Sequence, residues 1–254
     1  MKSKKIFLLL AIFFSFFPFS QKISFVPSIR VTYNSALNLG ENFKKEQKFV
    51  LIGNSQDYYF GANQNYLNDT GQYESKGVDL RAISDYFQER VIMQNGIINT
   101  FLTVTENKIR YQETLKLQWV LYSDTKIING IKCQMAATNK FGRRWIAYFS
   151  KEYSQSLGPY KFNGLPGLIF ELYDTRDDYH FTASKVEKFN DEFSFNIGAF
   201  KKYDKQDYLK ASFNLRFTSA SLPVLQGEMR KEFDDMMKRK QKRFNNPLEL
   251  KPFE

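Results

Sequence analysis

The sequence predicts a mainly β (α+β) protein with one large curved antiparallel sheet and an amphipathic helix near its C-terminus. Short segments of alternating apolar and polar residues follow one another through the central third of the chain. Two Asn-Gly pairs, Asn95-Gly96 and Asn129-Gly130, indicate tight hairpins, because both central residues of such a turn need a positive φ. After Pro223 the apolar period changes to helical spacing.

The N-terminus has the layout of a secretory signal peptide. A basic start over Met1–Lys5 precedes an apolar run from Ile6 to Phe17, and Ser20 follows a break at Pro18. The apolar run is shorter than the roughly 20 residues that span a bilayer. We expect cleavage near Ser20 and export to the periplasm or the outer membrane, with an uncleaved anchor as the alternative. Residues 1–20 are thus the signal peptide, and residues 21–254 form a single β-rich domain.

Composition narrows the choice of partners. The chain has a formal net charge of +10 and is 17% aromatic. The positive charge fits a solvated surface, and also approach to an anionic membrane surface or an acidic ligand. Nucleic acid fits an exported chain poorly. Cys133 is the only cysteine, so the chain forms no internal disulfide and depends on its core. A buried, inert thiol is favoured over a nucleophile at Cys133.

Strands are expected along most of the chain, with turns or loops between them. Residues 54–77 are rich in polar residues and predict a long loop. Residues 79–88 predict a short helix, and residues 209–219 predict a last strand. The other expected strands are 22–33 with a break near Pro27, 48–52, 97–104, 108–113, 117–122, 127–128, 131–138, 143–149, 168–173 and 179–184.

The C-terminal helix is amphipathic. Leu225, Met229, Phe233 and Met236 recur at helical spacing, and the chain is acidic early and basic late, as the helix dipole prefers. We expect this helix to dock on the sheet. A helix that binds a membrane surface or a partner is the alternative.

Glycines and prolines define a rigid loop in the middle of the chain. Residues 158–167 contain three glycines and two prolines, and Pro166-Gly167 predicts a type II turn. An apolar strand with one buried face is expected directly after it. The loop is no phosphate-binding loop, because Leu165 and Pro166 stand where that motif needs lysine and a hydroxyl residue.

The same segment carries a resemblance to a known family. Residues 164–169 read Gly-Leu-Pro-Gly-Leu-Ile, and Gly158, Pro159, Lys161 and Phe162 match the lead-in to this motif. The chain resembles the GLPGLI family of exported bacterial envelope proteins, which implies kinship and compartment but no particular chemistry. Further similar stretches are Trp119, Cys133-Gln134-Met135-Ala136, Arg143-Arg144-Trp145 and Asn246-Pro247-Leu248-Glu249-Leu250.

The sequence contains little that indicates a catalytic site. His180 is the sole histidine and no G-x-S-x-G segment accompanies it. We predict no catalytic residues, no metal ligands and no cofactor. The predicted binding residues belong to the loop: Gly158, Pro159, Phe162, Gly164, Leu165, Pro166, Gly167, Leu168 and Ile169. Secondary candidates are Arg143, Arg144, Trp145 and Glu171.

Three functions remain open. The first is a non-catalytic envelope protein that binds an apolar or amphipathic ligand, such as a lipid or peptide, or an outer-membrane protein. The second is a hydrolase whose carboxylates, such as Glu171 and Asp174, converge in a pocket. The third is a structural assembly factor at the outer membrane. At the level of the fold, a curved sheet that wraps a helix is analogous to the periplasmic lipoprotein-carrier folds. The sequence leaves the oligomeric state open.

Overall fold

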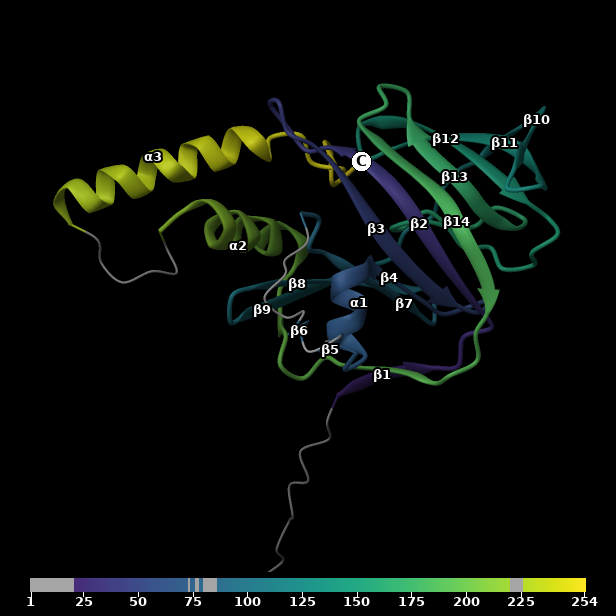
Figure 1. The fold of residues 1–254 in the computed structure, drawn as a ribbon, viewed down its shortest axis with the longest axis horizontal. Coiled ribbons are helices and arrows are strands. Elements are labelled where there is room, and N and C mark those ends of the chain that lie inside the picture. The colour runs from purple at the N-terminus through teal and green to yellow at the C-terminus, as the bar shows by residue number, and fades with distance from the viewer. Residues whose placement is uncertain (1–20, 73, 76–77, 80–85, 220–225) are drawn as a thin grey trace, which may run out of the picture.

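The computed structural model describes residues 21–72, 74–75, 78–79, 86–219 and 226–254 (Figure 1). It confirms a mainly β protein with a large antiparallel sheet and a helix near the C-terminus. The predicted signal peptide lies outside the described residues, as does most of the helix expected over 79–88. At the ends of that range, β6 (Val78–Asp79) pairs with β5 (Glu74–Ser75), and residues 86–88 are not helical.

Two antiparallel meanders make one sheet of twelve strands within the described residues. They join where β14 pairs with β2. Figure 1 shows the strands changing direction strongly from one meander to the other, so the sheet is twisted and curved. The first meander is β2 (Ile29–Asn38), β3 (Lys44–Gly53), β4 (Tyr58–Ala62), β7 (Arg90–Gln94), β8 (Ile97–Val104) and β9 (Asn107–Glu113). The second is β10 (Val120–Ile128), β11 (Ile131–Lys140), β12 (Arg143–Ser150), β13 (Leu168–Asp174) and β14 (Tyr179–Lys188). The short strand β16 (Lys201–Lys202) adds to β9 in parallel.

Both predicted Asn-Gly hairpins are present. Asn95 and Gly96 have φ values of 53° and 76°, and Asn129 and Gly130 have 50° and 80°. Each pair forms the two-residue loop of its hairpin, between β7 and β8 and between β10 and β11. These turns fix the register of the strands that they connect.

The long loop predicted over 54–77 is wrong over its central part. That range contains β4 and the helix α1 (Asn63–Asp69). Every residue of β4 is buried, so the strand has no polar face and lacks the alternation that identifies half-buried strands.

The strand predicted after the loop is present as β13, but the expectation that only one of its faces is buried is wrong, because β13 is buried on both faces. A register shift next to Phe149 in β12 interrupts the alternation. Ile169 and Phe170, which are successive residues, therefore both join the main core.

The strand predicted over 209–219 is a helix, α2 (Lys205–Phe217). The carboxylate of Asp204 caps it by accepting a hydrogen bond from the Asp207 amide. Tyr208 and Leu215, two turns apart, pack in the apolar cluster that contains Ile109 and Tyr111 of β9. The alternation of Phe213, Leu215 and Phe217 resembles the apolar pattern of a strand. The apolar residues from Tyr208 onward also recur at helical spacing, and the segment forms a helix.

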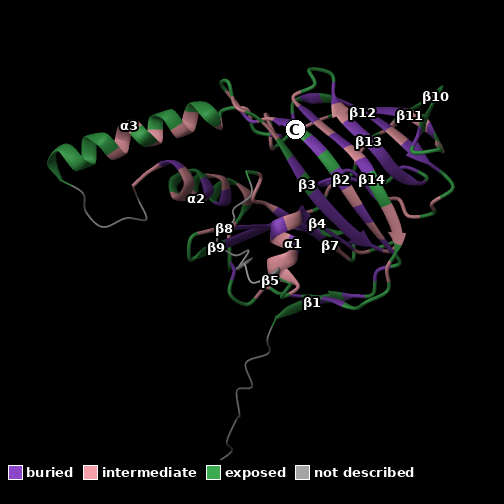
Figure 2. Ribbon diagram, in the orientation of Figure 1, coloured by how far each residue is buried: buried purple, intermediate pink, exposed green. Residues whose placement is uncertain are grey.

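The C-terminal helix α3 (Gly227–Arg243) forms as predicted, but its docking on the sheet is wrong. None of its residues is buried. Figures 1 and 2 show α3 projecting from the body of the protein alongside α2, with mostly exposed and partly exposed residues. None of the described helices is both long and apolar enough to cross a bilayer.

The sheet buries apolar side chains on both faces. In β3, Leu51 and the residue two positions before it face the main core. Val50 and Ile52, which alternate with them, face a second core. The second core lies under α1 and a two-stranded sheet of β1 (Lys22–Phe25) and β15 (Phe193–Asn196). In the main core, the chain's own loop residues and Leu248 fill the space against the sheet.

Candidate functional site

The glycine-rich loop completes the main core. Phe162 is fully buried and its ring centroid lies 4.6 Å from that of Trp145 and 6.3 Å from that of Trp119. The Trp119 indole N–H donates to the carbonyl oxygen of Asn163 at 2.9 Å. The loop is thereby held between two tryptophans of the second meander, and its main contacts are structural.

The turn at Pro166 differs from the type II turn predicted for it. The Gly167 amide donates to the Leu165 carbonyl oxygen at 2.7 Å, across Pro166 alone. Gly167 has a φ of +151°, far from the value of about +80° that a type II turn requires at this position. A Cβ at Gly167 would lie 2.1 Å from the carbonyl oxygen of Ser150. Glycine is therefore required by contact as well as by conformation.

A buried lysine ties the loop to the C-terminal segment. The fully buried Lys161 ammonium contacts the Tyr111 hydroxyl at 2.6 Å and the carboxylates of Glu113 and Glu249 at 2.6 and 2.5 Å. Lys205 of α2 adds contacts of 2.7 and 3.1 Å to the same two carboxylates. Burial alone would lower the pKa of Lys161, but Glu249 and Glu113 outweigh it and the pKa is raised.

A buried arginine holds the same C-terminal segment from the other side. The Arg143 side chain is 1% exposed, and its guanidinium lies 2.9 Å from the carboxylates of both Asp174 and Asp178. It also donates to the Asn246 side-chain oxygen at 2.6 Å and to the carbonyl oxygens of Pro247 and Leu248 at 2.9 and 3.0 Å. Because these groups occupy the guanidinium, Arg143 is a clamp for the segment 246–248.

Glu171 and Asp174 do not come together. Glu171 binds Lys126 at 2.6 Å and His180 at 3.1 Å, whereas Asp174 binds Arg143. Burial alone would raise the pKa of Glu171, but hydrogen bonds from His180 and Lys126 outweigh it and the pKa is lowered. A carboxylate of this kind is ionised and paired, which is the opposite of a general acid with a raised pKa.

The predicted site residues therefore have varied surroundings. Gly164 and Pro166 are exposed, and the other seven loop residues are buried. Trp145 lies in the core, and Arg144 is exposed with its guanidinium 3.2 Å from the Tyr122 hydroxyl. The two pockets beside α2, described next, are lined by none of these residues, so a binding role for them stays a prediction. Among the described residues, no group of three or more His, Cys, Asp or Glu side chains converges as a metal site requires.

A small cavity lies between the loop, α2 and the C-terminal segment. Its volume is about 110 Å³, and Glu89, Tyr160, Tyr208 and Glu249 are among the residues that line it. Burial raises the pKa of Glu89, whose carboxylate receives a 3.4 Å hydrogen bond from the Tyr208 hydroxyl. The cavity is smaller than the 300 to 1,000 Å³ that is usual for drug-sized ligands.

A larger, open pocket adjoins the cavity, and we call it the α2–α3 groove. Its volume is about 570 Å³, and it shares Tyr86, Gln88, Arg216 and Phe244 with the small cavity. Aromatic rings form one part of its lining: the Phe43 centroid lies 5.2 Å from that of Phe244 and 5.6 Å from that of Tyr86. The lining residues are Phe43, Tyr86, Gln88, Arg216, Met236, Met237, Arg239, Lys240, Arg243 and Phe244.

Four of these lining residues are cations: Arg216, Arg239, Lys240 and Arg243. In the part of the chain that the structure describes, the ion pairs of α3 are Arg230–Asp234 and Lys238–Asp235, and none involves the four groove cations.

Three of the groove cations, Arg216, Lys240 and Arg243, contact aromatic rings rather than carboxylates. The Arg216 guanidinium lies 5.5 Å from the Phe244 ring centroid, and that of Arg243 lies 5.5 Å from the centroid of Phe43. Burial lowers the pKa of Lys240, and the nearby charge of Arg216 lowers it further. The groove therefore combines an apolar aromatic wall with crowded positive charge.

Sequence analysis missed this groove. Phe43 lies in the turn between β2 and β3, Arg216 lies in α2, and Phe244 follows α3. The only sequence feature noted above that belongs to the groove is the basic end of the C-terminal helix. Recognising 209–219 as a helix would have placed Arg216 beside it.

Comparisons with known proteins bear on the fold alone. No protein-family profile matches the chain, and no curated protein matches it. The chain is similar to a solved protein named PNGF-II in two crystal forms, with TM-scores of 0.57 and 0.56 and 14% identity in both. The matches cover 80% of this chain but 36% and 35% of the other, so the chain spans about a third of that protein's length.

A second group of structures overlaps less well. A LolA superfamily protein from Nitrosomonas europaea covers 65% of this chain and 87% of its own, at 7% identity and a TM-score of 0.29. At that score we transfer nothing from it to this chain.

Proposed function

We propose that this chain is an exported, non-catalytic envelope protein of the GLPGLI type that binds an amphipathic ligand with an anionic head, such as a fatty acid or lipid, in the α2–α3 groove. The observation that carries the proposal is the chemistry of the groove. Aromatic rings and two methionines offer apolar contact next to four cations without carboxylate partners among the described residues.

The size of the groove supports this choice over the interior of the protein. At about 570 Å³ the groove falls in the range of small-molecule sites, whereas the inner cavity of about 110 Å³ does not. Loop residues and the C-terminal segment already fill the space against the main face of the sheet. A ligand chain would thus lie between the helices rather than against the sheet.

The positive charge of the groove favours a ligand with an anionic head over a ligand with a neutral head. Placing an anion beside Arg216 and Lys240 relieves the repulsion between the two cations, which contributes to the lowered pKa of Lys240. Arginine also matches carboxylate and phosphate groups through paired hydrogen bonds. The aromatic rings remain available to the apolar part of the ligand.

Titration calorimetry with dodecanoate tests the proposal, and dodecyltrimethylammonium, with the same alkyl chain and the opposite charge, is the control ligand. We expect dodecanoate to bind more tightly, and Arg216→Gln and Lys240→Gln each to weaken its binding by about tenfold. Lys231→Gln removes the same charge from a residue of α3 that does not line the groove, and its affinity should match the unaltered protein. Mass spectrometry should recover the dodecanoate unchanged after incubation.

The proposal fails if both ligands bind equally, since the cations would then have no role. It also fails if Arg216→Gln and Lys240→Gln behave like Lys231→Gln. Recovery of a chemically altered ligand would remove the non-catalytic part of the proposal.

A further inference from the structure

One side of α3 is apolar and open to solvent. Met229, Phe233, Met236 and Met237 follow one another at intervals of three or four residues or stand side by side, so they form one stripe along the helix. Met229 is 64% exposed and Met236 is 44% exposed. No described residue of α3 is buried against the body of the protein.

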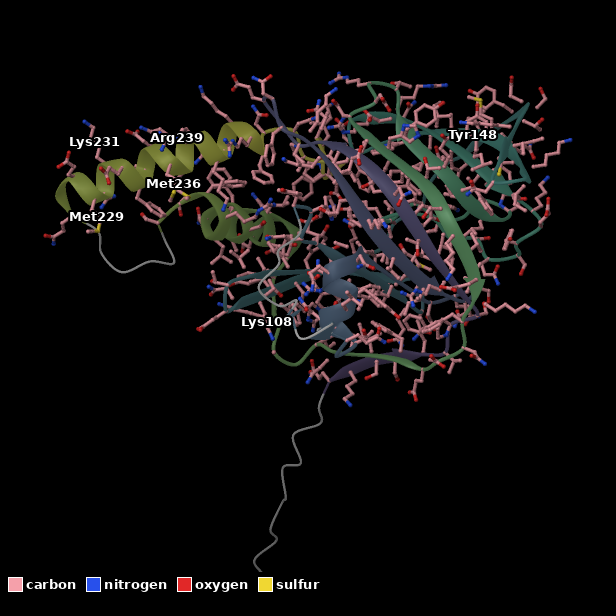
Figure 3. The ribbon with its side chains drawn as sticks, in the orientation of Figure 1. Lys108, Tyr148, Met229, Lys231, Met236 and Arg239 are labelled. Atoms are coloured by element: carbon pink, nitrogen blue, oxygen red, sulfur yellow. The ribbon has the colours of Figure 1, made fainter. Side chains whose placement is uncertain are left out.

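The rest of α3 is strongly charged, with four acidic residues in its first half and basic residues in its second half. Figure 3 shows Lys231 on the opposite side of the helix from Met229. The second half of the helix, residues 236–243, contains five basic residues and no acidic one. These are Lys238, Arg239, Lys240, Lys242 and Arg243.

We infer that α3 is a membrane-surface helix that lays the N-terminal part of its stripe, Met229 and Phe233, into an anionic bilayer with its basic half against the lipid headgroups, while Met236 and Met237 line the α2–α3 groove. Helices of this kind have a large apolar moment, a basic polar face and low overall hydrophobicity. This inference extends the proposed function, because a helix on the bilayer would bring the α2–α3 groove, which α3 lines, to the source of its ligand.

Charge favours a bilayer over a second copy of the chain packed in parallel. Such copies, stripe to stripe, would place their basic halves close together, and like charges would oppose that contact. An antiparallel copy, whose acidic half would face the basic half, is an outcome of the test below. An anionic surface attracts the same residues and accepts the apolar stripe without a fixed shape. Methionine side chains, which are flexible and unbranched, suit such a disordered surface.

Vesicle co-sedimentation tests the inference. The sample is the chain from Gln21 onward, because the predicted signal peptide would itself bind lipid. Vesicles of phosphatidylglycerol and phosphatidylcholine are compared with vesicles of phosphatidylcholine alone. We expect binding to the anionic vesicles to be at least about tenfold tighter, and to weaken when salt rises from about 50 to about 300 mM.

A matched pair of variants tests the stripe. Met229→Glu adds a negative charge to the apolar side of α3, and Val26→Glu adds the same charge at a 57% exposed apolar residue remote in sequence from α3. We expect Met229→Glu to lose about tenfold in affinity for the anionic vesicles and Val26→Glu to lose much less. Circular dichroism should show both variants folded.

Equal binding to both kinds of vesicle, or equal loss in both variants, overturns the inference. So does capture of a second copy in place of vesicles, detected as a dimer that Met229→Glu dissociates. Met229 does not line the groove, so Met229→Glu should keep its dodecanoate affinity. In the unaltered protein, dodecanoate binding without vesicle binding would reject the membrane helix alone, and vesicle binding without dodecanoate binding would reject the groove alone.

Discussion

Replacing Gly167 by alanine should destabilise the protein severely, because the added methyl group has no room. Its Cβ would lie 2.1 Å from the carbonyl oxygen of Ser150 and 2.7 Å from the carbonyl carbon. Both contacts are with backbone, so no side-chain rotation relieves them. The first residue of β13, Leu168, pairs with Ser150, so the strands β12 and β13 would have to separate at this end.

Two effects add in this variant. A non-glycine residue forced into the glycine-only part of φ space costs about 1 to 3 kcal/mol. Overpacking a closely packed site costs typically about 1 to 3 kcal/mol more. We therefore expect Gly167→Ala to lower the free energy of unfolding by about 4 kcal/mol. With a urea slope of about 2 kcal/mol per molar, the midpoint falls by about 2 M.

Gly164→Ala is the matched control in the same loop. Gly164 also has a positive φ, +85°, but a Cβ there would meet nothing within 4 Å. Only the left-handed conformation is penalised, by about 1 to 2 kcal/mol. Urea unfolding followed by tryptophan fluorescence suits the comparison, because Trp119 and Trp145 both contact Phe162 of the loop.

Equal losses in the two variants would refute the reasoning, because the clash with Ser150 distinguishes them. A folded fraction of Gly167→Ala should still bind dodecanoate with unchanged affinity, since the loop does not line the α2–α3 groove. A selective loss of affinity would instead support the loop as a binding element.

Three further predictions concern buried ionisable groups. Lys161→Met removes the fully buried cation between Glu113 and Glu249 and leaves them with Lys205 alone, which should cost about 3 kcal/mol in urea unfolding. Lys210→Met, at an exposed ion pair, should cost less than about 1 kcal/mol, and similar losses would contradict the prediction. Burial raises the pKa of Glu89, so between its unfolded and folded pKa values the native state holds an extra proton and loses stability as pH rises. Glu89→Gln should therefore have the higher Tm at neutral pH and lose this advantage in acid; an advantage only in acid would reverse the sign. Burial raises the pKa of the Cys133 thiol to about 11, so a thiol reagent at mildly alkaline pH should label it only after denaturation. Rapid labelling of the native protein would show that Cys133 is accessible.

The predictions that rested on local sequence patterns were the reliable ones. Asn129-Gly130 specifies a hairpin by its own backbone preferences, and no distant residue alters that outcome. The strands of the second meander follow from their own alternation and from such turns. The helix α3 was likewise predicted from apolar spacing within one segment.

Local sequence patterns gave wrong predictions where tertiary packing determines the secondary structure. Strand β4 lies between β3 and β7 and is covered on both faces, so its residues show no alternation. Alternation near Phe213 suggested a strand, whereas the cap at Asp204 and contacts of Tyr208 with β9 stabilise a helix. Docking of α3 was inferred from its apolar stripe, which amphipathic helices on other surfaces also possess.

The loop shows how far a motif can predict a site. Sequence analysis found the segments that contain Arg143, Lys161 and Glu249 separately and assigned binding to the loop. The structure brings these segments to one region through long-range ion pairs that no local pattern encodes. The groove is equally non-local, because its lining residues come from segments far apart in the sequence.

The clamp at Arg143 also constrains the order in which the chain can fold. Its hydrogen-bond partners Asn246, Pro247 and Leu248 follow it by more than a hundred residues. A polypeptide that emerges N-terminus first can pair β2 with β14 while this guanidinium still lacks three of its five acceptors. The clamp therefore closes only after residue 248 has arrived. For a chain exported as proposed above, such late closure would keep the interior open until the polypeptide has been threaded through a secretion channel.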